Sequence, residues 1–300
     1  AVLDLIRKSD STVRTAETWR GNDMTAMLAF DGDRLIGIIP FEKRIVVIDD
    51  STKMNVLWVS AAHVEPEYRG QGIGTRLDEG IKDIFLPEFE AVFVIRKDEG
   101  SAAYRWYKKL GYHHLTNIFS LKRKVTPVEG RVTCVVFETA QEFEQYGSQL
   151  KNCFEHFIDH CGGYPQRDEK FWARKFNYHY YKAFYNYKIV AVRVGDIIQA
   201  YTLLGQTSFW DGIERFDILE FVTPPSEDIK MKLWNAILSL ANQLRLGELR
   251  VQLADGDPAV EWFKNLGFVQ RWQTNLLGKY INSEKAFPDI NWKFFHIDYI

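Results

Sequence analysis

The feature that most constrains this chain is the glycine-rich hexapeptide RGQGIG, at residues 69–74. It follows the apolar run VLWVSAAHVEP, residues 56–66, which is typical of a buried strand. After it, apolar residues recur with the spacing of one helical face, at Ile73, Leu77, Ile81 and Ile84. The pattern predicts a strand, a glycine turn and a helix, in that order.

A helix that begins at such a turn is suited to bind an anion. Its first N–H groups have no acceptor within the helix, and the helix dipole places partial positive charge at the same end. Glycine lets the backbone approach a ligand because no Cβ stands in the way. The expected ligand is a phosphate or a pyrophosphate.

Three phosphate-binding patterns compete for this loop, beside an ordinary turn that uses glycine for its shape. A P-loop requires a lysine after the last glycine, and none is present. A dinucleotide fingerprint has Thr75 where its third glycine belongs. The stretch VEPEYRGQGIG resembles the acyl-CoA pyrophosphate loop of the GNAT superfamily of N-acetyltransferases, with Arg69, Gly72 and Gly74 at its fixed positions.

A second motif strengthens the resemblance. The segment SAAYRWYKKLGY, residues 101–112, is similar to a helix of the same family, with Tyr107 at its tyrosine position. The strand candidate AVFVI, residues 91–95, lies between the two motifs. The resemblance spans about residues 20–123 and implies an α/β fold built on a mixed α+β sheet. The strand that usually opens the family's fold is expected to be missing here, because the chain begins almost inside the first predicted helix, within residues 1–20.

The resemblance also implies the site and its cofactor, acetyl-CoA. The pyrophosphate would lie on the loop, formed by Arg69, Gly70, Gln71, Gly72, Ile73, Gly74 and Thr75. Pantetheine would lie along the strand residues Ala62, His63 and Val64. Tyr107 would donate a proton to the leaving thiolate, although a purely structural aromatic residue is the alternative.

The general base stays open at this stage. His63 has a suitable pKa range, but strand alternation places its side chain on the face opposite Ala62 and Val64. Glu65 and Glu67 adjoin the loop and are expected in solvent.

After a polar linker at residues 121–131, the order of predicted elements repeats with a period of about 155 residues. The segment AVEWFKNLGF, residues 259–268, corresponds to AYRWYKKLGY, but has Phe263 in place of Tyr107. The loop is replaced by VTPPSEDIKMK, residues 222–232, which contains no glycine. We therefore predict two tandem GNAT-like acyl-CoA N-acyltransferase domains, a catalytic one at residues 1–126 and a degenerate one at 127–300.

Bulk properties exclude several classes. A formal net charge of −2 gives no electrostatic case for nucleic acid or an anionic membrane. No apolar run approaches the ~20 residues of a membrane span, and the N-terminus lacks a signal peptide's apolar region. Three cysteines form no disulfide framework, and no metal-binding motif is present. A cytoplasmic protein is expected, and a homo-oligomer is compatible with the sequence.

The expected function is transfer of an acetyl group to a primary amine, with a small-molecule amine favoured because nothing resembles a peptide-docking insert. The alternative is a non-catalytic acyl-CoA-binding or regulatory module that recruits a partner through its second copy. The aromatic segment at residues 164–188 is expected in the core of the second copy, or as an aromatic wall for a substrate.

Overall fold

The computed structural model describes the chain from residue 25 to residue 293, with gaps. The described residues are 25–59, 62–85, 88–97, 99–127, 134–137, 140–158, 162–169, 171–172, 186–208, 212–281, 286–288, 290 and 292–293. The predicted N-terminal helix and most of the aromatic segment lie outside the described residues.

Two compact units make up the chain, and each is assembled from separate stretches of sequence. Unit 1 comprises residues 1–117, 162–166 and 273–290. Unit 2 comprises residues 118–161, 167–272 and 291–300. The division into a first domain at residues 1–126 and a second at residues 127–300 stays a prediction.

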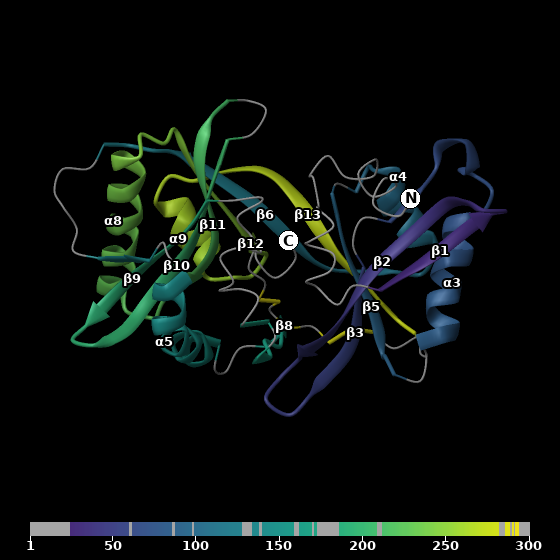
Figure 1. Cartoon of the computed structure of the whole chain (residues 1–300), viewed down its shortest axis with the longest axis horizontal. Helices are drawn as coiled ribbons and strands as arrows, with labels where there is room; N and C mark the ends of the chain where they lie inside the picture. The colour runs from purple at the N-terminus through teal and green to yellow at the C-terminus, as the bar shows by residue number, and fades with distance from the viewer. Residues whose placement is uncertain are drawn as a thin grey trace. The chain divides into compact units, whose positions relative to one another are not determined.

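Unit 1 is built on a mixed sheet (Figure 1). Its strands follow the order β1, β2, β3, β5 and β13, with β3 and β5 parallel and the other neighbours antiparallel. The elements are β1 (Thr25–Asp31), β2 (Arg34–Val47), β3 (Lys53–Val59), β5 (Ala91–Lys97), and the end of β13 (Val269–Tyr280). Two short strands, β4 (His63–Val64) and β8 (Tyr164–Pro165), pair with β2.

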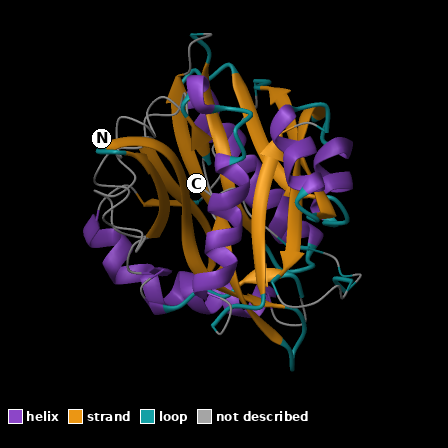
Figure 2. Cartoon of the chain, turned by 90° about the vertical axis from the view of Figure 1, so that its right-hand side faces the viewer, coloured by secondary structure: helices purple, strands orange, loops and turns teal. Residues whose placement is uncertain are grey.

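One face of this sheet is covered by the predicted amphipathic helix, α3 (Ile73–Phe85). Its residues Ile73, Leu77 and Ile81 are buried against the strands, as the spacing predicted. Ile84 was expected on the same face but is 60% exposed, because the helix ends one residue later. Figure 2 shows helices in purple beside the orange strands.

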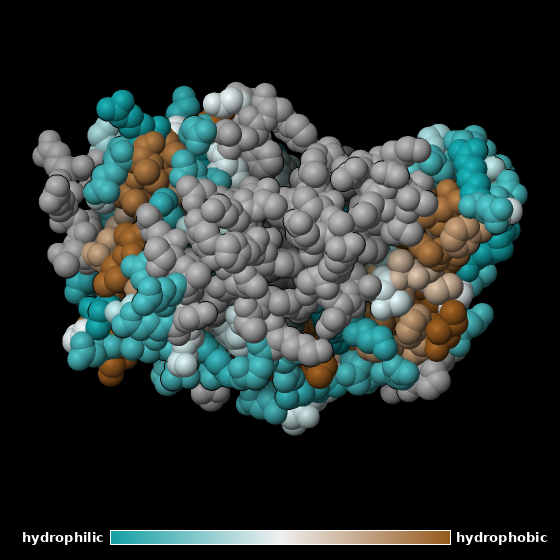
Figure 3. Space-filling model, viewed as in Figure 1, coloured by the Kyte–Doolittle hydropathy of each residue, from teal (hydrophilic) through white to brown (hydrophobic). Residues whose placement is uncertain are grey.

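The strand β1 ends the described sheet and exposes part of its apolar surface. Leu28 and Phe30 are 37% and 57% exposed. Figure 3 shows brown, apolar surface on the side of the view where β1 lies.

The strands of unit 2 also form a mixed arrangement, with the order β6, β12, β11, β10, β9 and β7. Its strands are β6 (His113–Lys124), β7 (Val135–Phe137), β9 (Asn186–Val194), β10 (Ile197–Ser208), β11 (Glu214–Val222) and β12 (Glu248–Ala254). Its helices are α5 (Ala140–Ile158), α8 (Glu227–Gln243) and α9 (Ala259–Asn265). The apolar face of α8, including Leu233 and Ile237, is buried in the core of unit 2.

The family resemblance implies a final pair of strands around Tyr112 to Lys122, and the structure contradicts this expectation. This region forms the single strand β6, whose residues 118–124 pair antiparallel with β12 in unit 2. In unit 1, the antiparallel neighbour of β5 is instead residues 274–280 of β13. Each unit is therefore closed by a strand from the other half of the sequence.

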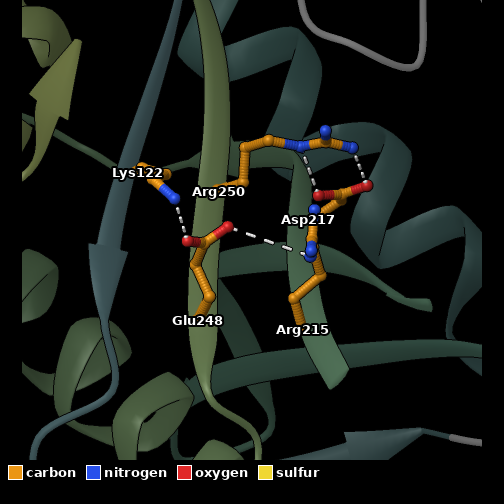
Figure 4. Close-up of polar contacts among 5 residues, drawn as sticks. All are labelled: Lys122, Arg215, Asp217, Glu248 and Arg250. Atoms are coloured by element: carbon orange, nitrogen blue, oxygen red, sulfur yellow. Dashed lines mark hydrogen bonds and ion pairs between the residues drawn. The ribbon is translucent and has the colours of Figure 1, made fainter. Parts of the chain in front are cut away.

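A charged cluster holds β6 in register within unit 2 (Figure 4). Lys122 Nζ lies 2.6 Å from Glu248 Oε2, and Arg250 Nε donates to Asp217 Oδ1 at 2.7 Å. Arg215 Nε lies 3.8 Å from Glu248 Oε1. Burial raises the pKa of Asp217, while Arg250 acts in the opposite direction. Breaking one partner would leave an uncompensated buried charge, so the cluster disfavours a shifted register.

Candidate functional site

The sheet of unit 1 opens at one point. The parallel pairing of β3 with β5 ends at Val59 and Val94, whereas β5 continues to Lys97. The short strand β4 pairs with β2 instead, through Val64 with Gly37 and His63 with Ile38. The predicted single strand is thus divided into β3 and β4, and the last residues of β5 lose their neighbour on this side. Strand-edge N–H and C=O groups are available where such pairing stops.

The glycine loop follows β4 directly. A short 3₁₀ helix, η1 (Pro66–Tyr68), leads into Gly70 and Gly72, whose φ angles are 78° and 77°. These left-handed values are accessible to glycine at little cost. The helix α3 then begins at Ile73, so the predicted order of strand, glycine turn and helix is present.

The start of α3 is left without an internal cap. The first bond of the helix runs from Arg76 N to Gly72 O at 3.0 Å. The N–H groups of Ile73, Gly74 and Thr75 precede it and have no acceptor within the helix. Gly72 has no side chain that could accept from them, and the first turn contains no acidic residue. These groups and the helix dipole together form an anion-binding end.

The three loop glycines have different surroundings. A Cβ at Gly70 would meet no heavy atom within 4 Å, and one at Gly72 would meet only Arg76 Nη1, at 3.8 Å. A Cβ at Gly74 would lie 3.0 Å from the ring of Trp106. Gly70 and Gly72 therefore serve the backbone conformation, whereas Gly74 permits close packing of α3 against α4 (Ala102–Lys109).

Two exposed cations accompany the loop. Arg69 Nε donates to Val64 O at 2.9 Å, which holds this side chain beside β4. Arg76 Nη1 lies 3.4 Å from Gln71 O. The nearby carboxylate of Glu67 forms an ion pair with Arg34. The local charge therefore favours an anionic ligand.

Tyr107, on α4, is 1% exposed, and its hydroxyl accepts a hydrogen bond from Arg96 Nη2 at 3.0 Å. The Arg96 guanidinium also lies 5.0 Å from the centre of the tyrosine ring. Burial raises the pKa of Tyr107, and Arg96 opposes that shift. The phenol therefore keeps its proton at neutral pH. Because Arg96 donates to its oxygen, the O–H bond is left to donate elsewhere.

Arg96 was missed by the sequence reasoning. It lies on β5, two residues beyond the last pair with β3, and thus where the strands separate. The one signal in the sequence was its position directly after the predicted strand at residues 91–95.

The residue next to Tyr107 connects α4 to the loop. The ring of Trp106 packs on Gly74, and its Nε1 lies 3.5 Å from Thr75 Oγ1. The rings of Trp106 and Tyr107 lie 4.5 Å apart. The structure therefore brings Tyr107, Arg96 and the start of α3 into one region of unit 1.

Behind Tyr107 lies a buried polar pair with a structural role. Tyr112 donates to Asp78 Oδ1 at 2.8 Å, and Asp78 Oδ2 lies 2.8 Å from Lys82 Nζ. Burial raises the pKa of Tyr112 well above its usual value. Its ring lies 4.9 Å from that of Tyr107, so the pair fixes the position of the Tyr107 ring.

The residues from Ala62 to Glu65 are all at least partly buried. Ala62 and Val64 pack on the apolar core of unit 1. The side chains of His63 and Glu65 are each 8% exposed, with His63 Nε2 4.0 Å from Glu65 Oε2. The expectation that Glu65 is solvated is wrong, because its N–H donates to Ile36 O at 2.9 Å and extends the pairing with β2. Glu67 is half-exposed.

The described residues contain no cluster of His, Cys, Asp or Glu suited to a metal ion. Among them, no helix has the length and apolar character needed to cross a membrane.

A known protein family matches the part of the chain that contains both the glycine loop and the Tyr107 helix. Residues 5–112 match the model of the acetyltransferase (GNAT) family. A search of curated proteins finds no match.

Solved structures resemble almost the whole chain. A probable N-acyltransferase of unknown function from Enterococcus faecalis aligns with a TM-score of 0.71 and 12% identity, over 93% of this chain and 69% of that one. A GCN5-related N-acetyltransferase from Anabaena variabilis aligns at 0.66 and 11%, with the same coverage of 93% and 69%. A tandem GNAT protein from the clavulanic acid biosynthesis pathway aligns at 0.59 and 13%, over 95% of this chain and 94% of that one. At these identities the alignments show a shared fold.

Proposed function

We propose that this chain, which carries an acetyltransferase domain of the GNAT family, transfers the acetyl group of acetyl-CoA to a primary amine. Acyl transfer in general follows from the family. A small-molecule amine is the favoured acceptor, since the sequence contains no insert that resembles a peptide-docking segment. The observation that carries the proposal is the uncapped start of α3 behind a loop of left-handed glycines.

The loop supports a pyrophosphate site. Backbone N–H groups of Ile73, Gly74 and Thr75 would bind the phosphate oxygens, with the exposed cations of Arg69 and Arg76 beside them. The remaining loop residues, Gly70 and Gln71, would shape the approach. An added negative charge at this position would oppose binding, because phosphate and carboxylate repel each other.

The opening between β4 and β5 supports a site for pantetheine. An extended amide chain can form backbone hydrogen bonds with the strand at residues 62–64, on the side that faces β5, as an added strand would. A backbone N–H there would polarise the thioester carbonyl and stabilise the oxyanion that forms on attack.

Tyr107 is the proposed acid. The acceptor nitrogen bonds to the carbonyl carbon, the C–S bond breaks, and the leaving sulfur takes the Tyr107 proton. The raised pKa keeps that proton in place until the sulfur is released. Arg96 would then stabilise the phenolate, which regains a proton from solvent.

The His63–Glu65 pair is the proposed base. A carboxylate 4.0 Å from an imidazole favours the protonated imidazolium, so His63 can accept a proton from the substrate ammonium before the free amine attacks. A His63→Gln variant should lower kcat about 100-fold, since general bases contribute ~10²–10⁴. A Glu65→Gln variant should have a smaller effect. Unchanged kcat in His63→Gln would move the role of base to another group.

Calorimetry with acetyl-CoA and a thiol-reagent assay for free CoA test the proposal together. One acetyl-CoA per chain should bind, and some member of a panel of primary amines should release CoA. Binding without release by any amine would instead support a non-catalytic acyl-CoA-binding module. Two equivalent sites per chain would contradict the single intact loop.

A further inference from the structure

Unit 2 also contains an opening between its two parallel strands. The pairing of β11 with β12 ends at Ile218 and Val251, while the strands continue to Val222 and Ala254. The same separation in unit 1 leads to the glycine loop. Unit 2 has therefore kept the opening, although its strand-to-helix junction differs.

A cavity of about 1170 Å³ lies at this opening, within unit 2. It is bounded by α5, the β9–β10 turn, the end of β11, and the first turns of α8 and α9. Figure 1 labels these elements. Pockets for small molecules usually measure roughly 300–1,000 Å³, so the volume is ample for one.

The junction of unit 2 is unsuited to a phosphate. Ser226 Oγ caps α8 by accepting from Ile229 N at 3.5 Å, and Glu227 and Asp228 occupy the first turn. Pro224 and Pro225, which precede the cap, have no N–H to donate. A cofactor that is held by its pyrophosphate would therefore meet carboxylates instead of free donors.

The walls of the cavity are largely apolar. Its apolar lining comes from α5, β10, β11, α8, β12 and α9, and includes Phe157, Ile198, Phe221, Ile229, Leu253 and Trp262. The rings of Phe221 and Trp262 lie 5.3 Å apart at 30°. Such a surface favours flat or aliphatic groups, because both lose contact with water there.

The charged side chains Lys293, Asp257, Lys230 and Asp196 of the lining each form an ion pair within the protein. Lys293 Nζ lies 3.0 Å from Asp257 Oδ2, Lys230 pairs with Glu227, and Asp196 pairs with Arg193. Burial raises the pKa of Cys153 to about 12, so this thiol is neutral at pH 7. An ionic ligand would lose hydration without gaining a counter-charge. The amides of Asn152 and Gln199 also line the cavity and can bond to a ligand, whereas the side-chain oxygen of Gln149 already accepts from Ile198 N at 3.2 Å.

We infer that this cavity of unit 2 binds an uncharged, largely apolar small molecule. The inference goes beyond acetyl transfer and does not depend on it. In each unit a ligand site would then lie where the two parallel strands separate. In unit 1 this place adjoins an anion-binding helix end, and in unit 2 it adjoins a capped helix end.

The test uses the full chain and two fluorescent probes, uncharged Nile red and anionic anilinonaphthalene sulfonate. Nile red should bind saturably, once per chain, at least 10-fold tighter than the anionic probe. Acetyl-CoA at saturation should not displace it. Two variants that place an indole in the cavity, Ala259→Trp and Asn152→Trp, should each weaken Nile red at least 10-fold.

Ser148→Trp is the matched control, because Ser148 is exposed on the same helix as Asn152 but does not line the cavity. It should bind Nile red as the parent does. If circular dichroism shows Ala259→Trp to be misfolded, Asn152→Trp decides, since its position is exposed. No saturable binding, equal affinity in Asn152→Trp and Ser148→Trp, tighter binding of the anionic probe, or displacement by acetyl-CoA would each overturn the inference. None of these results would affect a measured acetyl-CoA affinity or CoA release, so the proposed function stands or falls separately.

Discussion

The two strand-to-helix junctions of this protein differ where an anion could bind. In unit 1, α3 starts after Gly72, which has no side chain to cap it, and the first turn contains no acidic residue. In unit 2, α8 starts after Ser226, which caps it, and Glu227 and Asp228 follow. The cap and the two carboxylates stabilise the start of α8, whereas the start of α3 has neither. Only the start of α3 leaves its N–H groups and its dipole for a ligand, so the fold supplies the position and the junction sequence decides whether it can bind an anion.

The two units also differ at the corresponding positions Tyr107 and Phe263, of which only the first carries a hydroxyl group. Tyr107 and Phe263 are 1% and 0% exposed, each on a short helix and within the core of its unit. The Tyr107 hydroxyl meets Arg96, whereas Phe263 packs among Trp234, Trp262 and Phe268. Burial and ring shape alone therefore do not distinguish the proposed catalytic position from a structural one. What distinguishes the two positions is the hydroxyl of Tyr107 and its hydrogen bond with Arg96.

Separating the two halves of the chain should have the largest effect. Expressed alone, residues 1–126 should aggregate, because β5 would lose its partner, residues 274–280 of β13. Co-expression with residues 127–300 should restore a soluble complex that binds acetyl-CoA, since both closing strands are then present. Size-exclusion chromatography with calorimetry measures this. A soluble 1–126 fragment with the full activity of the parent would mean that the second half is an independent module.

A negative charge at the start of α3 should make this junction as unsuited to an anion as the acidic start of α8. Gly72→Glu should weaken acetyl-CoA binding about 100-fold or more, because close like charges cost several kcal/mol. Gly72→Ala is the control for backbone strain, which at φ 77° should account for about 10-fold. The reverse change, Ser226→Gly, should create no second site. Full affinity in Gly72→Glu by calorimetry would remove the loop from the proposed cofactor site.

Tyr107→Phe makes α4 resemble α9 and should lower kcat roughly 10–10³-fold, given that acid catalysis contributes ~10²–10⁴. The dissociation constant of acetyl-CoA should change little. Phe263→Tyr should leave kcat unchanged and serves as the matched control in unit 2. If turnover of Tyr107→Phe with a good acceptor equals that of the parent, the residue is structural.

Arg96→Met should have a smaller effect, roughly a 10-fold fall in kcat, consistent with a charge-assisted hydrogen bond of ~1.5–3 kcal/mol at a half-buried group. Arg96 lowers the pKa of Tyr107, so its removal makes the phenol a weaker acid. Any alkaline fall in kcat that reflects loss of the Tyr107 proton should move to higher pH. In a Tyr107→Phe background, Arg96→Met should change kcat no further. An equal loss in both backgrounds would show that Arg96 acts independently of Tyr107.

The helix caps should give the smallest effect. Ser101→Ala should lower the free energy of unfolding by about 1 kcal/mol, since Ser101 Oγ accepts from Tyr104 N at 3.1 Å. Ser226→Ala should cost less, because its bond to Ile229 N is 3.5 Å long. Denaturant titration measures both changes. A larger loss at Ser226 than at Ser101 would mean that the second junction depends on its cap more than the geometry indicates.

Much of the site could be predicted because its signals are local. Left-handed φ at Gly70 and Gly72, the start of α3 at Ile73 and the tyrosine on α4 all follow from short stretches of sequence. Arg96, by contrast, matters through a contact with a residue 11 positions away, and no local pattern marks it. The burial of Glu65 was missed because it depends on pairing with β2, which is distant in sequence.

The sequence by itself determined the order of elements, the glycine turn and the repeat, because each depends on backbone preference or on apolar spacing within a few residues. Only the tertiary structure decided which strands close each unit. β6 and β13 are both strands of 12 residues, and each supplies an antiparallel partner. The choice depends on partners far away in the chain, such as Glu248 for Lys122, and no short segment contains that information.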